Sequence, residues 1–138
     1  MTLVRNPYMN TPVKGFDFPE ETVFDLTHGD CWFLAASLSK ALQLPYATIY
    51  GDDEIQHVGV ELPDGNIVDI EGIWEPQEWE NRWYDALDAF DVYLGCHPGE
   101  DEGESILHSY EPYIEDYSYG GLRLSEIRDS ILKTFAVL

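Results

Sequence analysis

The spacing of hydrophobic positions predicts a helix in the first third of the 138-residue chain. Leu34, Leu38 and Leu42 recur at the interval that places residues on one helix face. The helix should end before Pro45, because a residue that precedes proline disfavours helical backbone. Residues 1–26 lack such a period and contain three prolines, so we expect an extended lead-in there.

The start of this helix has two interpretations. Thr27 and Asp30 have the spacing of a capping box, although glutamate or glutamine is the usual second member. Alternatively, Asp30 is itself the N-cap residue. Both interpretations place Cys31 close to the helix N-terminus.

An antiparallel hairpin is predicted after the helix. Hydrophobic and polar residues alternate over 56–62, as is typical of a strand, with His57 on the polar face. The sequence PDGN is a turn signature, and residues 67–70 form the returning strand. Residues 46–51 are rich in β-forming side chains and should form a neighbouring strand.

The length of the hairpin turn decides whether His57 and Asp69 can meet. With Asp64 and Gly65 as a two-residue turn, Asp69 faces Val60 and lies on the opposite face of the hairpin from His57. A direct contact requires positions on the same face. A longer turn would provide them, as would a one-residue bulge, for which Gly59 is a suitable site.

Two further helices are expected in the second half. Residues 76–94 fit a helix that Pro76 opens in its first turn, and residues 123–138 fit an amphipathic closing helix. Trp79 and Trp83 are one helical turn apart, so we expect them in the core rather than on a ligand-binding surface.

These elements predict an α+β fold in which a helix packs on an antiparallel sheet. The length favours a single domain over 1–138. Within it, residues 27–72 would form the functional core and residues 73–138 a helical, acidic C-terminal part.

The charge is strongly negative and spread along the chain. The 27 Asp and Glu residues outnumber the seven Lys and Arg residues, for a formal net charge of −20. Residues 1–72 carry 12 acids and three bases, and residues 73–138 carry 15 and four, so the excess is not an acidic tail. Such a surface repels nucleic acid and anionic lipid, and it could attract a basic protein or merely aid solubility.

With no membrane-length apolar stretch and no secretory signal, we expect a cytoplasmic protein.

Three residues of the predicted core fit the chemistry of a cysteine nucleophile. A thiol that attacks an acyl carbon needs a thiolate, a neighbouring imidazole and a group that orients the imidazole. Cys31 at a helix N-terminus, His57 on a strand and Asp69 on the next strand supply these types. Glu71 or Gln56 could replace Asp69 if it lies out of reach. The alternative for Cys31 is a small buried core residue.

Attack of a thiolate on a carbonyl also requires hydrogen-bond donors that stabilise the developing oxyanion. Residues 22–30 contain no glutamine that could serve. The backbone N–H of Cys31 and the side chain of Thr27 or His28 are the remaining candidates. His28 is also an alternative candidate for the base.

The segment GDCWFLAA, residues 29–36, closely resembles the active-site cysteine segment of calpains and, more loosely, that of papain-like peptidases. The order Cys, His, Asp resembles that of transglutaminase-like proteins. The segment HVGVELPDGNIVDIEG, residues 57–72, resembles the histidine-bearing hairpin of compact bacterial papain-like enzymes, including cell-wall peptidases of the NlpC type. The resemblance covers residues 27–72 and implies a minimal papain-like core.

The resemblance implies a cysteine hydrolase or acyltransferase, of protease, deamidase or transglutaminase type, with a peptide or protein acyl substrate. It implies no cofactor. Cys96, His97 and His108 match no structural zinc spacing, so no metal is expected either. The alternative function is a non-catalytic acidic protein, such as a viral or mobile-element DNA mimic, that binds a basic partner.

Overall fold

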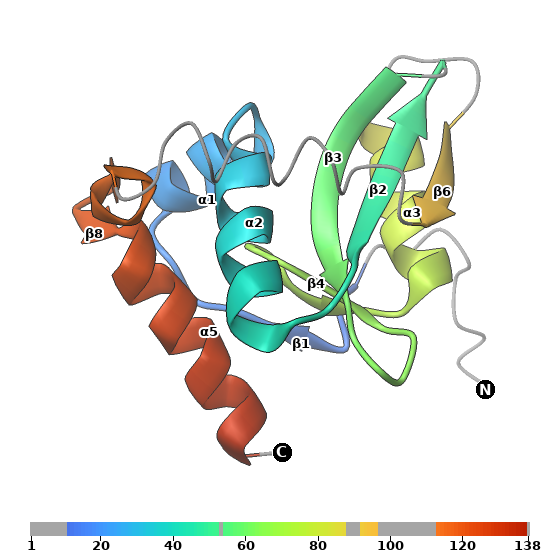
Figure 1. The fold of residues 1–138 in the computed structure, drawn as a ribbon. Helices are drawn as coiled ribbons and strands as arrows, with labels where there is room; N and C mark the ends of the chain where they lie inside the picture. The colour runs from blue at the N-terminus through green and yellow to red at the C-terminus, as the bar shows by residue number, and fades with distance from the viewer. Residues whose placement is uncertain (1–10, 53, 88–91, 97–112, 138) are drawn as a thin grey trace, which may run out of the picture.

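The structure is a computed structural model that describes residues 11–52, 54–87, 92–96 and 113–137. Its centre is a six-stranded antiparallel sheet in the order β1-β5-β4-β3-β2-β6 (Figure 1). The strands are β1 (Lys14–Gly15), β2 (Tyr46–Gly51), β3 (Glu54–Glu61), β4 (Ile67–Asp69), β5 (Gly72–Trp74) and β6 (Val92–Cys96).

Four α-helices accompany the sheet in the described part of the chain. They are α1 (Glu20–Thr27), α2 (Cys31–Leu42), α3 (Pro76–Ala86) and α5 (Leu124–Val137). A 3-10 helix, η1 (Tyr113–Asp116), and a two-stranded hairpin of β7 (Ser118–Tyr119) and β8 (Leu122–Arg123) lie between β6 and α5 in the chain. The predicted α+β fold, with the cysteine-bearing helix packed on an antiparallel sheet, is confirmed.

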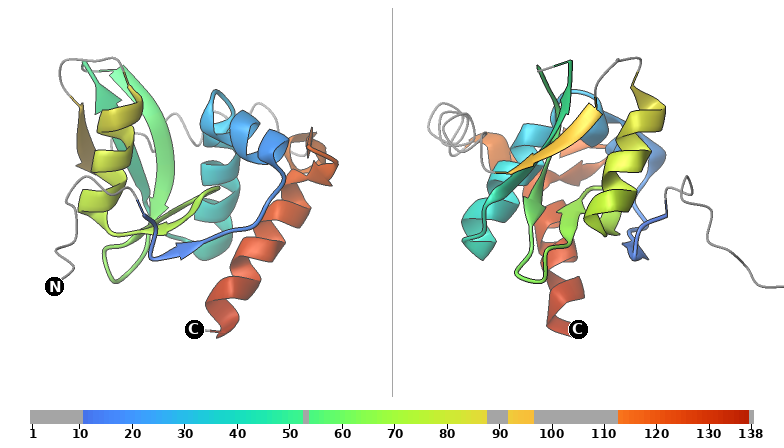
Figure 2. Two further views of the ribbon diagram at one scale, coloured as in Figure 1. Left: turned by 180° about the vertical axis from the view of Figure 1, so that it is seen from behind. Right: turned by 90° about the vertical axis from the view of Figure 1, so that its right-hand side faces the viewer.

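Helices cover both faces of the central strands (Figures 1 and 2). The larger core lies between the sheet and helices α2 and α5, where Leu34 and Leu38 of α2 pack with Val58 of β3. The smaller core lies between the sheet and α3, where Trp79 packs against Ile49 of β2. Consequently β3 is buried on both faces from residue 57 to residue 60, although its alternating sequence is typical of a strand with one exposed face.

The lead-in is not extended throughout, because residues 20–27 form α1. The helix that follows begins at Cys31, with Asp30 in the N-cap position but without a side-chain capping hydrogen bond. Thr27 is the last residue of α1, so the predicted capping box between Thr27 and Asp30 is wrong. The first turn of α1 contains Glu20 and Glu21, and acidic residues suit a helix N-terminus. The helix has only eight residues, too few for a clear hydrophobic period in the sequence.

The helix predicted over 76–94 is wrong beyond Ala86. The chain becomes extended at Leu87, and residues 92–96 form β6, which pairs with β2. Hydrogen bonds to the edge of β2 satisfy the backbone of this segment, and this tertiary pairing overrides the local helical period. The part of the chain after residue 73 therefore contains strands as well as helices, including the predicted closing helix, α5.

The hairpin turn is longer by one residue than the two-residue turn proposed from the sequence. Val60 pairs with Val68, and the loop consists of residues 63–65. The N–H of Leu62 donates to the carbonyl of Asn66 at 2.7 Å, and Gly65 has a φ of +90°, a conformation that favours glycine. This longer turn changes which residues share a face of the hairpin.

Among the described residues, no helix is long and apolar enough to cross a membrane.

Candidate functional site

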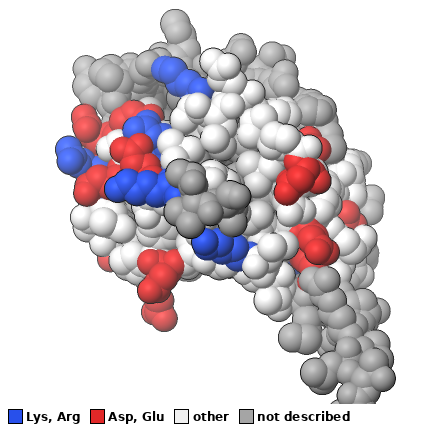
Figure 3. Space-filling model, turned by 90° about the horizontal axis from the view of Figure 1, so that it is seen from below, with Lys and Arg blue, Asp and Glu red and all other residues white. Residues whose placement is uncertain are grey.

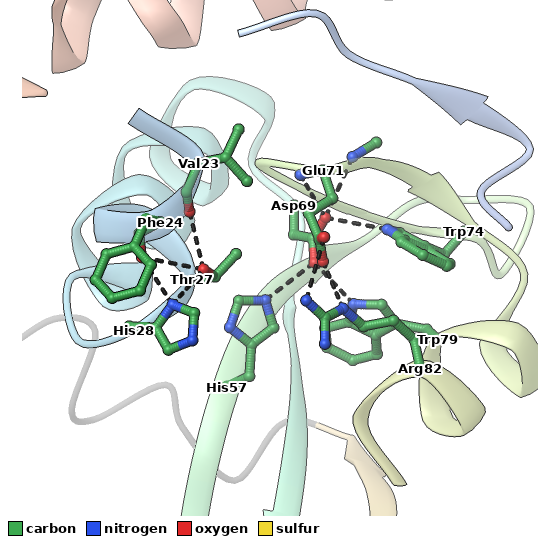
Figure 4. A network of polar contacts seen from close by, with 11 residues as sticks. Val23, Phe24, Thr27, His28, His57, Asp69, Glu71, Trp74, Trp79 and Arg82 are labelled. Carbon is green, nitrogen blue, oxygen red and sulfur yellow. Dashed lines mark hydrogen bonds and ion pairs between the residues drawn. The ribbon is translucent and has the colours of Figure 1, made fainter. Parts of the chain in front are cut away.

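His57 and Asp69 form a buried ion-pair geometry between β3 and β4. Nε2 of His57 lies 2.9 Å from Oδ2 of Asp69 (Figure 4). The relative exposure of His57 is 0% and that of Asp69 is 3%, so water screens this pair very little. The contact therefore holds the imidazole in one orientation.

The three-residue turn brings these two side chains onto one face. Extending the pairing of Val60 with Val68 by one position places Asp69 opposite Gly59. Gly59 is two residues from His57, so His57 and Asp69 become diagonal neighbours on the same face. The bulge that was proposed at Gly59 is therefore not needed; the register shift of β3 lies instead in its pairing with β2, between Ile49 and Tyr50 of that strand.

The carboxylate of Asp69 accepts hydrogen bonds from five donors. Oδ2 accepts from His57 and from the indole N–H of Trp79, both at 2.9 Å. Oδ1 accepts from the indole N–H of Trp74 at 3.1 Å and from the backbone N–H groups of Glu71 and Gly72 at 2.9 and 3.3 Å. These donors offset the cost of burying the charge. Asp69 is thus held as a carboxylate.

Gly59 allows Trp79 to reach this carboxylate. A Cβ atom at position 59 would lie 2.8 Å from the carbonyl oxygen of Val68 and 3.2 Å from the ring of Trp79. The absence of a side chain lets the indole lie close to the sheet. Trp79 and Trp83 lie in the core, as their helical spacing predicted, with exposures of 0% and 4%. Nothing in the spacing indicated their contacts with the site.

Trp83 covers one face of the imidazole. Its ring lies 4.1 Å from that of His57, centroid to centroid, at an interplanar angle of 25°. The guanidinium of Arg82 lies over the Trp83 ring at 4.3 Å. A stacked indole excludes water from His57 and limits its rotation about the Cα–Cβ bond.

Cys31 is a free thiol at the first residue of α2. It is 7% exposed, more than His57 or Asp69. Its side chain interacts with the imidazole of His57. Because Nε2 faces Asp69, Nδ1 is the nitrogen left for the thiol, and among the described residues no atom meets Nδ1 with hydrogen-bonding geometry. The three residues therefore lie in the order thiol, imidazole, carboxylate.

The pKa shifts of the three groups agree in direction. Burial alone lowers the pKa of His57, but hydrogen bonds and charge interactions with Asp69 and Cys31 outweigh it and raise the pKa to about 9. Burial alone raises the pKa of Cys31, yet the interaction with His57 and backbone hydrogen bonds from Val58 and Trp32 lower it below 9.0. The pair thus favours thiolate and imidazolium together.

The other residues considered for the site have different partners. The carboxylate of Glu71 binds Arg82 through two hydrogen bonds, of 2.6 and 3.2 Å. The exposed amide of Gln56 lies 3.5 Å from the carbonyl oxygen of Gly51. Neither residue takes the place of Asp69 beside His57.

Thr27 and His28 lie at the end of α1, on the side of His57 away from Arg82 (Figure 4). The hydroxyl of Thr27 donates to the carbonyl oxygens of Val23 and Phe24, at 2.9 and 3.0 Å. Nδ1 of His28 lies 2.8 Å from that hydroxyl and 2.9 Å from the carbonyl of Phe24. Since the hydroxyl proton goes to a carbonyl, Nδ1 of His28 carries hydrogen, and Nε2 is a donor only when the ring is protonated.

No group of three or more His, Cys, Asp and Glu side chains in the described residues is arranged to hold a metal ion. Cys96 ends β6, while His97 and His108 lie outside the described residues.

Comparisons of the chain with protein-family models, with curated proteins and with solved structures found no match.

Proposed function

We propose that this protein is a small cysteine hydrolase or acyltransferase with a papain-like or transglutaminase-like arrangement of residues. Cys31 is the nucleophile, His57 is the base and acid, and Asp69 orients the imidazole. The observation that carries the proposal is the buried contact of 2.9 Å between His57 Nε2 and Asp69 Oδ2, which leaves Nδ1 for the thiol. A structural core cysteine would not require an imidazole held in this way.

The chemistry follows from the charges of the pair. The thiolate of Cys31 attacks the carbonyl carbon of an amide or thioester, and a C–S bond forms as negative charge moves to the carbonyl oxygen. The carbonyl double bond then re-forms and the bond from the carbonyl carbon to the leaving group breaks. The imidazolium of His57 gives its proton to the departing amine or thiol, which leaves an acyl-enzyme. Water or an amine then attacks the acyl carbon, His57 accepts its proton, and the C–S bond breaks to release the product and restore the Cys31 thiolate.

The nucleophile that reaches the acyl-enzyme sets the overall reaction. Attack by water completes peptide hydrolysis, or deamidation where the leaving group is ammonia. Attack by a second amine completes acyl transfer. All three share Cys31, His57 and Asp69, so a test of this site needs no knowledge of the substrate.

The test is the pH dependence of Cys31 alkylation by iodoacetamide, with Cys96→Ser in every variant to remove the second thiol. In the parent protein we expect half-maximal reactivity well below the ordinary cysteine pKa of about 8.5. In His57→Ala the midpoint should rise above that value, because burial remains while the interaction that lowers the pKa is lost. Mass spectrometry of the Cys31 peptide gives the rate at each pH.

Two outcomes of the alkylation experiment would contradict the proposal. One is a parent thiol whose reactivity has an ordinary midpoint and does not respond to His57→Ala. The other is a profile that His28→Ala abolishes and His57→Ala leaves unchanged, which would make His28 the base. Retention of full acyl-transfer activity by Cys31→Ala would also exclude Cys31 as the nucleophile.

The second candidate is a non-catalytic protein that binds a basic partner, and the net charge of −20 favours it. On the face in Figure 3, carboxylates lie among basic side chains or stand apart from one another, rather than in continuous rows. Among the described residues, Arg123 pairs with Glu126 and Arg128 with Asp129, on α5 and the residue before it, so part of the acidic surface is neutralised. This candidate predicts salt-dependent binding to a basic protein that Cys31→Ala does not change.

A further inference from the structure

A hollow of about 330 Å³ lies between α1 with its flanking residues on one side and Glu71 together with Arg82 of α3 on the other. Its lining residues are Phe18, Glu20, Val23, Phe24, Thr27, His28, Glu71 and Arg82. The volume is at the lower end of the range for ligand sites, so it suits one side chain better than an extended ligand.

Two boundaries tie this hollow to the site. On one side, Thr27 ends α1 shortly before Cys31 begins α2, and Figure 4 shows Thr27 and His28 beside the imidazole of His57. On the other, the backbone N–H of Glu71 donates to Asp69 at 2.9 Å. The hollow therefore borders residues that flank His57 and Asp69, although Cys31, His57 and Asp69 do not themselves line it.

The walls of the hollow are apolar and aromatic. Phe24 is 61% exposed, and its ring stacks on His28 with 4.3 Å between the ring centroids. Phe18 and Val23 are partly buried and pack against the larger core. These surfaces can take the methylene groups of a long side chain, and an exposed aromatic face also attracts a cation.

The charges at the hollow are negative on balance. Glu71 and Arg82 neutralise one another through their ion pair, at 2.6 Å. Glu20 has no ion-pair partner among the described residues and lines the same hollow. One uncompensated carboxylate therefore remains, within the field of a protein that carries a net charge of −20.

We infer that this hollow selects acyl substrates with a lysine or arginine side chain next to the reacting carbonyl. The inference rests on the proposed function and names its substrate class. The stem of the side chain lies along Phe18, Val23 and Phe24, and its cationic head lies at Glu20. An apolar side chain would gain the same wall contacts without the carboxylate, and an acidic one would be repelled.

The test compares three probes that differ only in side chain: the chloromethyl ketones of N-acetyl-lysine, N-acetyl-norleucine and N-acetyl-glutamate. In each, the thiolate of Cys31 forms a bond to the methylene carbon as chloride leaves. The second-order rate of Cys31 labelling is measured by mass spectrometry in a Cys96→Ser background at low salt. The lysine probe should react about ten-fold faster than the norleucine probe, and the glutamate probe should be slowest.

Glu20→Gln tests the assigned carboxylate, and Glu21→Gln is its matched control. Both residues are exposed and lie in the first turn of α1, but Glu21 does not line the hollow. Glu20→Gln should lower the ratio of lysine to norleucine rates about three-fold, the scale of one exposed ion pair. Glu21→Gln removes the same net charge and should leave the ratio unchanged.

The outcomes separate this inference from the proposed function. Equal lysine and norleucine rates at an activated Cys31 would overturn the inference and leave the proposed function standing. Equal effects of Glu20→Gln and Glu21→Gln would show that the preference comes from the whole protein's charge, which also overturns it. A thiol that shows neither activation by His57 nor labelling by any probe would overturn both.

Discussion

Replacement of Asp69 by asparagine tests whether one buried carboxylate holds the site together. The side chains are nearly equal in size, so the change acts on charge and hydrogen bonding. If the amide oxygen takes the place of Oδ1, it can still accept from Trp74 and from the backbone N–H of Glu71. The amide NH₂ then replaces Oδ2 and faces two donors, His57 and Trp79.

The magnitude follows from these contacts. An unsatisfied buried donor costs about 1–3 kcal/mol, and removal of one partner from a buried ion pair costs about 3–5 kcal/mol. The terms overlap because both involve Oδ2, so we expect Asp69→Asn to lower the free energy of unfolding by about 3–5 kcal/mol. For a chain of this size the midpoint of thermal unfolding should fall by about 10–15 °C.

Urea denaturation at pH 7 measures the loss, and a double-mutant cycle with Trp79→Phe locates it. Phenylalanine removes the N–H that the asparagine NH₂ would face, so the double variant should be more stable than additivity predicts by about 1–3 kcal/mol. Asp64→Asn is the control, because Asp64 lies in the exposed turn, and its effect should be within about 0.5 kcal/mol. A loss below about 1 kcal/mol for Asp69→Asn, or an additive cycle, would refute the reasoning.

The pH dependence of this difference has a definite sign. Burial raises the pKa of Asp69, but the hydrogen bond and charge interaction with His57 lower it below 3.8, so its stabilisation is present above that pH and is lost on acidification. The pKa of His57 rises from 6.5 to about 9, so its contribution is complete below pH 6.5 and is lost as the pH rises to 9. The stability difference between wild type and Asp69→Asn should be largest between these limits, near pH 4 to 6.5.

Two further substitutions test the packing around the site. Gly59→Ala should lower the free energy of unfolding in urea by about 1–3 kcal/mol, because the new Cβ would lie 2.8 Å from a carbonyl oxygen of the next strand. Gly15→Ala is the control and should cost little, because the nearest atom to its Cβ would be 3.8 Å away. Equal losses in the two variants would contradict the close approach at Gly59. Arg128→Leu should cost about 1 kcal/mol, because it breaks a half-buried ion pair of 2.8 Å with Glu115. Arg123→Leu, which removes an exposed ion pair, should leave the free energy of unfolding almost unchanged. A larger loss for Arg123→Leu than for Arg128→Leu would contradict this ranking by burial.

The local elements and the candidate residues followed from the sequence. Leu34, Leu38 and Leu42 have the period of α2, and the alternation over 56–62 has the period of β3. Both signals arise from the chain's own geometry, which repeats every 3.6 or every 2 residues. The place of Cys31 in the GDCWFLAA segment at a helix start, and of His57 on the strand that follows, selected these two residues as thiolate and base.

The contact between His57 and Asp69 could not be derived from spacing. One extra residue in the turn moves every later side chain to the other face, and PDGN fits both a two-residue and a three-residue turn. Residues 92–96 posed a similar problem, because their strand forms only when the edge of β2 is available for pairing.

The sequence alone thus determined α2, the hairpin of β3 and β4, and which side chains could do the chemistry of the site, because these depend on neighbours along the chain. It did not reveal α1 or the end of α3. Only the tertiary structure decided that α3 covers the polar face of β3, where Trp79 binds Asp69 and Trp83 stacks on His57. That burial removes water from the charged pair and by itself lowers the pKa of His57, but the hydrogen bonds and charges of Asp69 and Cys31 outweigh it and raise the pKa to about 9. A shift of this kind depends on atoms that are distant in sequence and close in space.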